Sequence, residues 1–156
     1  VVAGGSVTAD SYHITAPEPK GLGASRAVRQ ALEQADASVD DVTHINAHAT
    51  STPTGDIAEY KALLSVFGDR VHEIPVSATK ASTGHLLGGT GALEAVFTVL
   101  ALHNRLAPPT INITEQDPEI PLRVGEAVEL RDGDHVAISN SFGFGGHNAV
   151  AAFRSV

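Results

Sequence analysis

Strand-like segments alternate with helix-like segments along this chain, and this alternation is the feature that most restricts its fold. Segments rich in Val, Ile and Thr, each predicted to be a strand, lie at residues 1–9, 42–47, 73–77, 127–130, 135–139 and 149–153. Helical patterns separate the first three strands and follow the third. Such an order is typical of a layered α/β unit, in which loops at the carboxyl ends of strands carry the chemistry.

Three helices are predicted between these strands. The first covers residues 25–35, where apolar side chains recur at spacings of three and four. The second begins with Thr52 as N-cap and Pro53 at its first position, and runs to Phe67. Its predicted inward-facing residues are Ile57, Tyr60, Leu64 and Phe67. The third, at residues 91–105, is apolar almost all round and is predicted to be buried on most sides.

Composition excludes several classes of protein. The chain has 156 residues, of which 42% are hydrophobic, so a single globular domain is expected. Its net charge of −8 argues against nucleic acid or an anionic membrane surface as the main partner. No apolar run is long enough for a membrane span and no signal peptide is evident, which predicts a soluble, cytoplasmic protein.

The chain has no Cys and no Met. Without Cys there can be no disulfide, no thiolate metal ligand and no Cys nucleophile in this chain. Because it begins with Val1 and not with Met, we expect it to be part of a longer or processed protein.

Two histidines stand in polar loops that follow predicted strands. His48 is followed by a dense group of hydroxyl side chains, which includes Thr50 and Thr52. His85 lies five residues after Lys80 and has glycines on both sides, which let the backbone approach another group closely. Taken singly, each histidine is more often a structural residue than a catalytic one.

A third loop, with the sequence SFGFGGHN, separates the last two predicted strands. One interpretation is a tight turn. The other is a set of exposed backbone N–H donors beside a movable aromatic side chain, with Phe142, Gly143, Phe144 and Gly145 as its members.

Neither a dinucleotide site nor a zinc site fits these loops. No GxGxxG sequence opens a helix after a strand. His48 and His85 are far apart in sequence, and neither belongs to a closely spaced ligand pair such as HxxxH. Asp56 and Glu59 are expected to serve the start of the second helix or to hold a nearby base. No metal and no cofactor are therefore predicted.

The three loops together, NAHATSTPTGDIAE, STGHLLGGTGALE and SNSFGFGGHN, closely resemble the β-ketoacyl-acyl-carrier-protein synthases, the elongating condensing enzymes of fatty-acid synthesis. The opening segment SYHITAPEPKG extends the resemblance over essentially the whole chain. It implies the C-terminal half of a thiolase-like fold, built as αβαβα layers in the intact enzyme. Residues 1–156 would form the C-terminal domain, and the N-terminal half with the nucleophilic Cys would lie elsewhere.

The resemblance also implies a function and partners. The intact enzyme would be an acyltransferase that condenses malonyl-acyl-carrier protein with an acyl-Cys intermediate by decarboxylative Claisen chemistry. Its partners would be the acyl carrier protein, with a malonyl or acyl group on phosphopantetheine, and a second protomer in a homodimer. This chain alone is expected to be inactive in condensation because it has no Cys.

Site residues are carried over from the same resemblance. His48 and His85 would donate hydrogen bonds to the malonyl thioester oxygen, and Lys80 would be the active-site lysine, paired here with Glu59. Asp56 would be a supporting carboxylate. Thr50 and Thr52 would bind the phosphopantetheine arm. Phe144 would be the gating phenylalanine, with its backbone N–H in the oxyanion hole.

Two positions depart from the family pattern, and two other functions remain open. Ala49 stands where many relatives have glycine, and His147 where many have threonine. A polyketide ketosynthase resembles the chain less, because its loop usually reads HGTGTxxGDPxE. A non-catalytic chain-length partner would usually lose active-site groups, whereas this chain keeps His48, Lys80, His85 and Phe144. A thiolase is disfavoured because its second half brings its own Cys.

Overall fold

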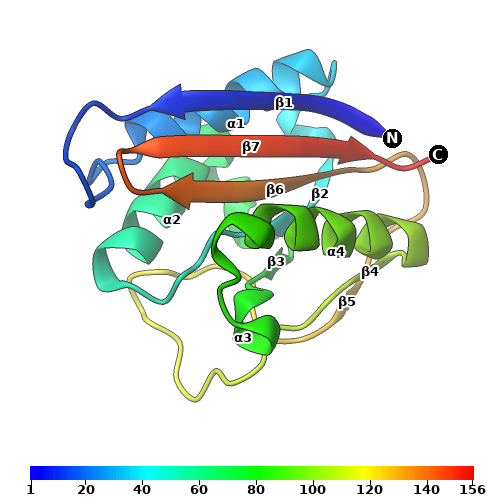
Figure 1. Ribbon diagram of the computed structural model, residues 1–156. Helices are drawn as coiled ribbons and strands as arrows, with labels where there is room; N and C mark the ends of the chain where they lie inside the picture. The colour runs from blue at the N-terminus through cyan, green and yellow to red at the C-terminus, as the bar shows by residue number, and fades with distance from the viewer.

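A five-stranded mixed sheet forms the centre of the protein, in a computed structural model that describes residues 1–156 (Figure 1). The strand order is β1-β7-β6-β2-β3. The strands are β1 (Val2–Ala9), β2 (Val42–Asn46), β3 (Val76–Ser77), β6 (Val136–Gly143) and β7 (His147–Arg154). β2 runs parallel to both β3 and β6, whereas β7 is antiparallel to its neighbours β1 and β6.

Helices cover both faces of this sheet. α1 (Leu22–Gln34) and α2 (Pro53–Phe67) lie on one face, and α4 (Thr90–Asn104) lies on the other (Figure 1). Short elements complete the chain: η1 (Val39–Asp41), η2 (Gly68–His72), α3 (Lys80–Thr83), η3 (Leu87–Gly89), and a two-stranded sheet of β4 (Leu106–Ala107) and β5 (Val128–Glu129). None of the helices combines the length and apolar composition needed to cross a bilayer. The predicted α/β order is confirmed.

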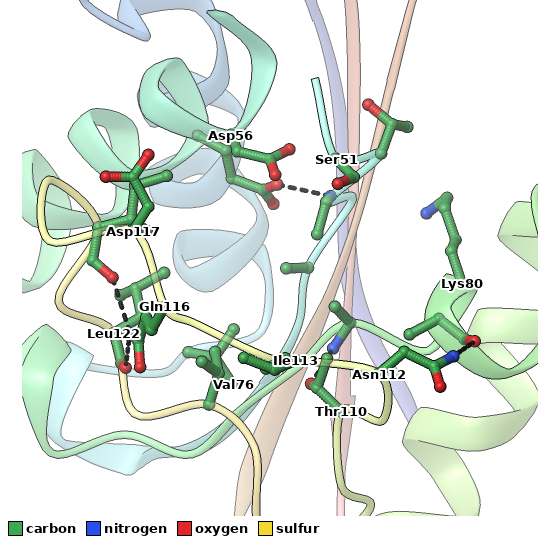
Figure 2. A pocket seen from close by; sticks show the side chains of 18 of the residues that line it. Ser51, Asp56, Val76, Lys80, Thr110, Asn112, Ile113, Gln116, Asp117 and Leu122 are labelled. Atoms are coloured by element: carbon green, nitrogen blue, oxygen red, sulfur yellow. Dashed lines mark hydrogen bonds between the residues drawn. The ribbon is translucent and has the colours of Figure 1, made fainter. Parts of the chain in front are cut away.

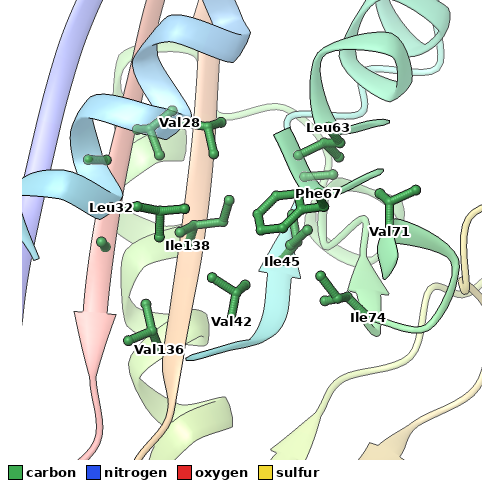
Figure 3. Packing of buried hydrophobic residues seen from close by; sticks show 14 of the residues in the cluster. Val28, Leu32, Val42, Ile45, Leu63, Phe67, Val71, Ile74, Val136 and Ile138 are labelled. Atoms are coloured by element: carbon green, nitrogen blue, oxygen red, sulfur yellow. The ribbon is translucent and has the colours of Figure 1, made fainter. Parts of the chain in front are cut away.

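The main core lies between the sheet and the α1–α2 layer. It contains 18 buried residues, among them Val28 and Leu32 from α1, Leu63 and Phe67 from α2, and Ile45 from β2 (Figure 3). Small residues bring the two helices close together. A Cβ on Gly21, which has a φ of 65°, would lie 2.4 Å from the carbonyl oxygen of Ala58 in α2. Glycine is therefore required where α1 begins.

The inward face of α2 differs from the prediction. Its fully buried residues are Ala58, Glu59, Ala62, Leu63 and Phe67, so Phe67 alone of the four predicted residues is fully buried. Ile57, Tyr60 and Leu64 are half-buried at the edges of this face. Tyr60 and Leu64 still pack against the main core together with Phe67, so the prediction is confirmed for these three residues. It missed Ala58, Glu59, Ala62 and Leu63, which α2 also buries.

The prediction that α4 is buried on most sides is wrong for this chain. Val96, Val99 and Leu100 point away from the sheet and are 53%, 45% and 47% exposed. The face toward the sheet instead buries Glu94 and Thr98. Apolar residues on all sides of a helix indicate that every side is suited to burial. Nothing within this chain covers the outer face of α4, so its apolar residues there remain exposed.

Candidate active site at the carboxyl ends of parallel strands

The parallel strands β2, β3 and β6 end at the same edge of the sheet. His48 follows β2 by two residues, Lys80 and His85 follow β3, and Phe142 lies near the end of β6. These residues, which are far apart in sequence, therefore meet at one place. The ring centroids of His48 and His85 are 5.9 Å apart at an interplanar angle of 87°, and those of His48 and Phe142 are 5.6 Å apart.

Hydrogen bonds define the tautomer of His85. Its Nδ1 accepts a bond of 3.0 Å from the Leu87 backbone N–H and lies 2.9 Å from Thr90 Oγ1. A backbone N–H can only donate, so Nδ1 must be unprotonated and the ring proton must be on Nε2. His85 is thus a neutral imidazole whose Nε2–H can donate a hydrogen bond.

His48 is held neutral by its surroundings. Burial is the main cause that lowers its pKa to about 3, and the charge of Lys80 and the neighbouring His85 act in the same direction. Its Nδ1 is buried and has no hydrogen-bond partner. At pH 7 the site therefore contains two neutral imidazoles side by side.

Lys80 pairs with Glu94 of α4, not with Glu59 as predicted. Its Nζ lies 2.6 Å from Glu94 Oε1, and both side chains are buried. Thr79 Oγ1 donates to the same carboxylate oxygen at 3.3 Å and to Asn46 Oδ1 at 3.2 Å. The sequence analysis did not predict Glu94 as this partner. A signal existed, because Glu94 is the single charged residue of an apolar helix and a buried charge requires a partner.

Glu59 instead anchors the loop that carries His48. Its carboxylate accepts bonds from the backbone N–H groups of His48 and Ala49 at 2.9 and 2.8 Å, and from Asn140 Nδ2 at 2.9 Å. Burial raises the pKa of Glu59, and these three bonds oppose that rise. The carboxylate therefore connects the His48 loop to β6.

The His48 loop adopts strained backbone conformations. Ala49 has a φ of 35° and Ser51 a φ of 61°. A left-handed conformation is costly for a residue with a Cβ, and glycine would adopt it without that cost. The bonds from Glu59 hold Ala49 in this conformation.

A cavity of about 660 Å³ is lined in part by His85, and Figure 2 shows other residues that line it. Its lining includes Thr50, Thr52, Lys80 and His85, and the two threonine Oγ1 atoms are 3.3 Å apart. Asp56 and Glu59 also line it, whereas His48, Phe142, Gly143, Phe144 and Gly145 do not. Burial raises the pKa of Asp56, while the N–H groups of Ser51 and Thr52 oppose that rise. One wall, which includes Val76, Ile113 and Leu122, is apolar (Figure 2).

The third predicted loop is shorter than expected. β6 continues to Gly143 and β7 begins at His147, so the turn contains only Phe144, Gly145 and Gly146. Phe144 is 78% exposed at its tip. The two glycines have φ values of 83° and 73°, a region that favours glycine.

The segment that follows β1 holds this turn in place. The Asp10 carboxylate accepts bonds from Asn148 Nδ2 at 2.7 Å and from the Glu18 N–H at 3.0 Å. The Asp10 N–H donates to the Gly146 carbonyl at 2.9 Å, and the Gly145 N–H donates to the Ile14 carbonyl at 2.7 Å. The Gly145 N–H is therefore already bonded and is not one of the free donors predicted from the sequence.

The fold and the site define a class of protein: one unit of a thiolase-like fold, with paired histidines at the strand ends and no Cys. The model of the β-ketoacyl synthase C-terminal domain matches residues 1–114. The chain belongs to this family and corresponds to its C-terminal half.

Known proteins of the family are similar over nearly the whole chain. The 3-oxoacyl-[acyl-carrier-protein] synthase 2 of Synechocystis sp. is 47% identical over 98% of this chain and 37% of that protein. A β-ketoacyl synthase from Burkholderia phymatum superposes with a TM-score of 0.87 at 38% identity, over 99% of this chain and 37% of that one. A type II polyketide ketosynthase, solved in complex with its acyl-carrier protein, gives 0.93 at 31% identity, over 99% and 38%. This chain thus spans just over a third of the length of its relatives.

Proposed function

We propose that this chain is the C-terminal half of a 3-oxoacyl-[acyl-carrier-protein] synthase of fatty-acid biosynthesis. The whole enzyme would condense malonyl-acyl-carrier protein with an acyl group held on a Cys of the N-terminal half. The observation that carries this proposal is the pair of neutral imidazoles, 5.9 Å apart, with the His85 proton on Nε2. Relatives that are 47% identical and named for this activity support it.

The paired histidines fit the decarboxylation step. When malonyl thioester loses CO₂, the electron pair of the broken C–C bond moves into an enolate with negative charge on the thioester oxygen. His48 and the His85 Nε2–H donate to that oxygen, and they are preorganised before the charge develops. The enolate carbon then attacks the acyl thioester on the Cys, a new C–C bond forms, and the thiolate leaves.

Lys80 fits a supporting electrostatic role in this step. Its buried ammonium group is fixed by Glu94, and it helps to lower the pKa of His48. His48 therefore donates a hydrogen bond as a neutral imidazole and does not titrate near pH 7. Glu59 and Asp56 maintain the loop that presents His48 and the two threonines.

Thr50 and Thr52 are suited to bind the amide-bearing phosphopantetheine arm of the acyl carrier protein. Both line the cavity beside His85, and short hydroxyls can accept from and donate to amides. The polyketide ketosynthase complex is the related structure that supports a carrier protein as partner. The turn of Phe144, with Phe142, Gly143 and Gly145, would gate the acyl site of the other half and contribute the Phe144 N–H to its oxyanion hole.

The N-terminal half would cover the outer face of α4. Val96, Val99 and Leu100 form an exposed apolar surface there, on the opposite side of the sheet from the main core. A homodimer and a cytoplasmic location complete the proposal, and both are taken from the family.

A chimeric enzyme tests this function. The 37% of the Synechocystis synthase that matches this chain is replaced by it, and release of CO₂ from malonyl-acyl-carrier protein is measured. His48→Ala and His85→Ala should each lower the rate by about 10²–10³, because each removes an oxyanion donor. Acylation of the Cys should persist in both variants. His103→Ala, at the exposed end of α4, is the control, and its rate of decarboxylation should equal that of the unmutated chimera. Unchanged decarboxylation in both active-site variants would refute the assigned roles.

A polyketide ketosynthase, or its chain-length partner, is the second candidate. The ishigamide ketosynthase/chain length factor superposes with a TM-score of 0.91, although its identity is 35%. The intact protein, in which this chain is joined to its own N-terminal half, distinguishes the two functions, since a fatty-acid synthase accepts saturated acyl groups for repeated elongation. Condensation of polyketide intermediates alone would favour the second candidate.

A further inference from the structure

His147 occupies a distinctive position beside the turn of Phe144. Its backbone pairs with Gly143 of β6 on one side and with Ala9 of β1 on the other, so its main chain is fixed. Its imidazole lies against Gly145: a Cβ placed on Gly145 would be 3.2 Å from both Cδ2 and Nε2 of the ring. The ring therefore stands directly beside the glycine, although the His147 residue as a whole is exposed to solvent.

Gly145 is thus constrained from two sides. Its N–H donates to the Ile14 carbonyl at 2.7 Å, and the His147 ring lies on the side to which a Cβ of residue 145 would point. Displacement of the turn toward the ring is blocked by the imidazole, and displacement that separates Gly145 from Ile14 breaks the hydrogen bond. A threonine at position 147 would end at its γ atoms and lack the ring atoms that lie beside Gly145.

We infer that His147 is a positioning residue that braces the turn of Phe144 by the bulk of its ring. The brace keeps the turn in the conformation in which the Gly145 N–H bonds to Ile14. What the turn does in catalysis rests on the proposed function, but the brace itself is a property of this chain. The turn should consequently open less often than it would with threonine at position 147.

Amide hydrogen exchange of the isolated chain tests the brace. The Gly145 N–H reports the bond to Ile14, and the N–H of Ala152, inside β7, serves as the internal reference. The measured quantity is the ratio of the two exchange rates, which corrects for any general loss of stability. His147→Thr and His147→Ala should raise this ratio about tenfold by favouring local opening.

His147→Phe is the matched control, because it keeps a flat ring and removes the nitrogen atoms. We expect its ratio to stay within about twofold of the wild-type value. An unchanged ratio in the Thr and Ala variants would overturn the inference, and a tenfold rise in the Phe variant would show that bulk is not the cause. No substrate is present in this experiment, so its outcome is independent of the proposed condensation activity.

Discussion

The two faces of the central sheet are covered in opposite ways. Toward α1 and α2 the sheet buries a continuous apolar cluster of 18 residues (Figure 3). Toward α4 it buries a polar layer, whose members include Asn46, Lys80, Glu94 and Thr98, and an apolar cluster of only five residues at one end. α4 also presents Val96, Val99 and Leu100 to solvent.

The two faces therefore have different roles: one stabilises the fold, and the other positions residues of the site. The α1–α2 layer stabilises the fold through apolar burial, which needs no exact polar geometry. The polar layer under α4 contributes less to stability, because each buried polar group must first lose its water. It does hold Lys80 and the β3 end in a defined position beside the histidines. We therefore expect the two faces to respond differently to substitution.

Breaking the buried ion pair should have the largest effect on stability. Glu94→Ala leaves the Lys80 ammonium buried without a counter-charge, so the free energy of unfolding should fall by about 4 kcal/mol. Urea denaturation followed by circular dichroism measures this change. The double variant Lys80→Met/Glu94→Leu should recover most of the lost stability, because an apolar pair of similar size needs no counter-charge. A double variant no more stable than Glu94→Ala would contradict the assigned polar role of this face.

A pair of apolar truncations compares the two faces directly. Leu63→Ala in the α1–α2 core should lower the free energy of unfolding by about 3 kcal/mol, because a fully buried side chain leaves a cavity. Val99→Ala on the exposed face of α4 should change it by less than about 0.5 kcal/mol. Both values come from the same urea titrations. In the chimera with an N-terminal half, a clear loss of stability from Val99→Ala is expected, and its absence would argue that α4 stays uncovered.

The sequence predicted the apolar face better than the polar one. Helices α1 and α2 and strands β2, β6 and β7 follow from periodicity, since their large apolar residues pack within this chain. The sequence did not predict the partner of Lys80. Glu94 and Glu59 are both carboxylates close to a loop in the sequence, and only the folded sheet brings α4, and with it Glu94, next to Lys80. The histidine pair was found through the loop motifs, whereas its geometry required the parallel register of β2 and β3.

The third prediction uses pH to test the polar face. His44 is fully buried in β2, with Nε2 2.9 Å from Ser77 Oγ, and Ser77 Oγ donates to the Pro108 carbonyl at 2.6 Å. Burial lowers the pKa of His44 to about 4 from its usual 6.5. The unfolded chain therefore takes up a proton between these values while the folded chain does not, and the free energy of unfolding falls as pH drops.

The expected size of this effect is about 2 kcal/mol between pH 7.5 and pH 5. It is obtained as the difference between wild type and His44→Gln, because Gln does not titrate. His48, whose pKa is also lowered, and Asp56 and Glu59, whose pKa values are raised, are present in both proteins and cancel. Equal pH dependence in wild type and variant would show that His44 is not kept neutral by the polar face.

The smallest predicted effect concerns the strained loop between the two faces. Ala49→Gly should raise the free energy of unfolding by about 1 kcal/mol, because the φ of 35° at this position is costly for alanine and not for glycine. Ala37→Gly is the matched control. Ala37 has no positive φ, so the added freedom of the unfolded chain should lower the free energy of unfolding of this variant by about 0.5–1 kcal/mol.

Glu59 holds the N–H groups of residues 48 and 49, so the stability gained by Ala49→Gly should persist only while that carboxylate is present. In a Glu59→Gln background the loop can relax, so Ala49→Gly should then give a smaller gain, and an undiminished gain would show that Glu59 does not enforce the strain.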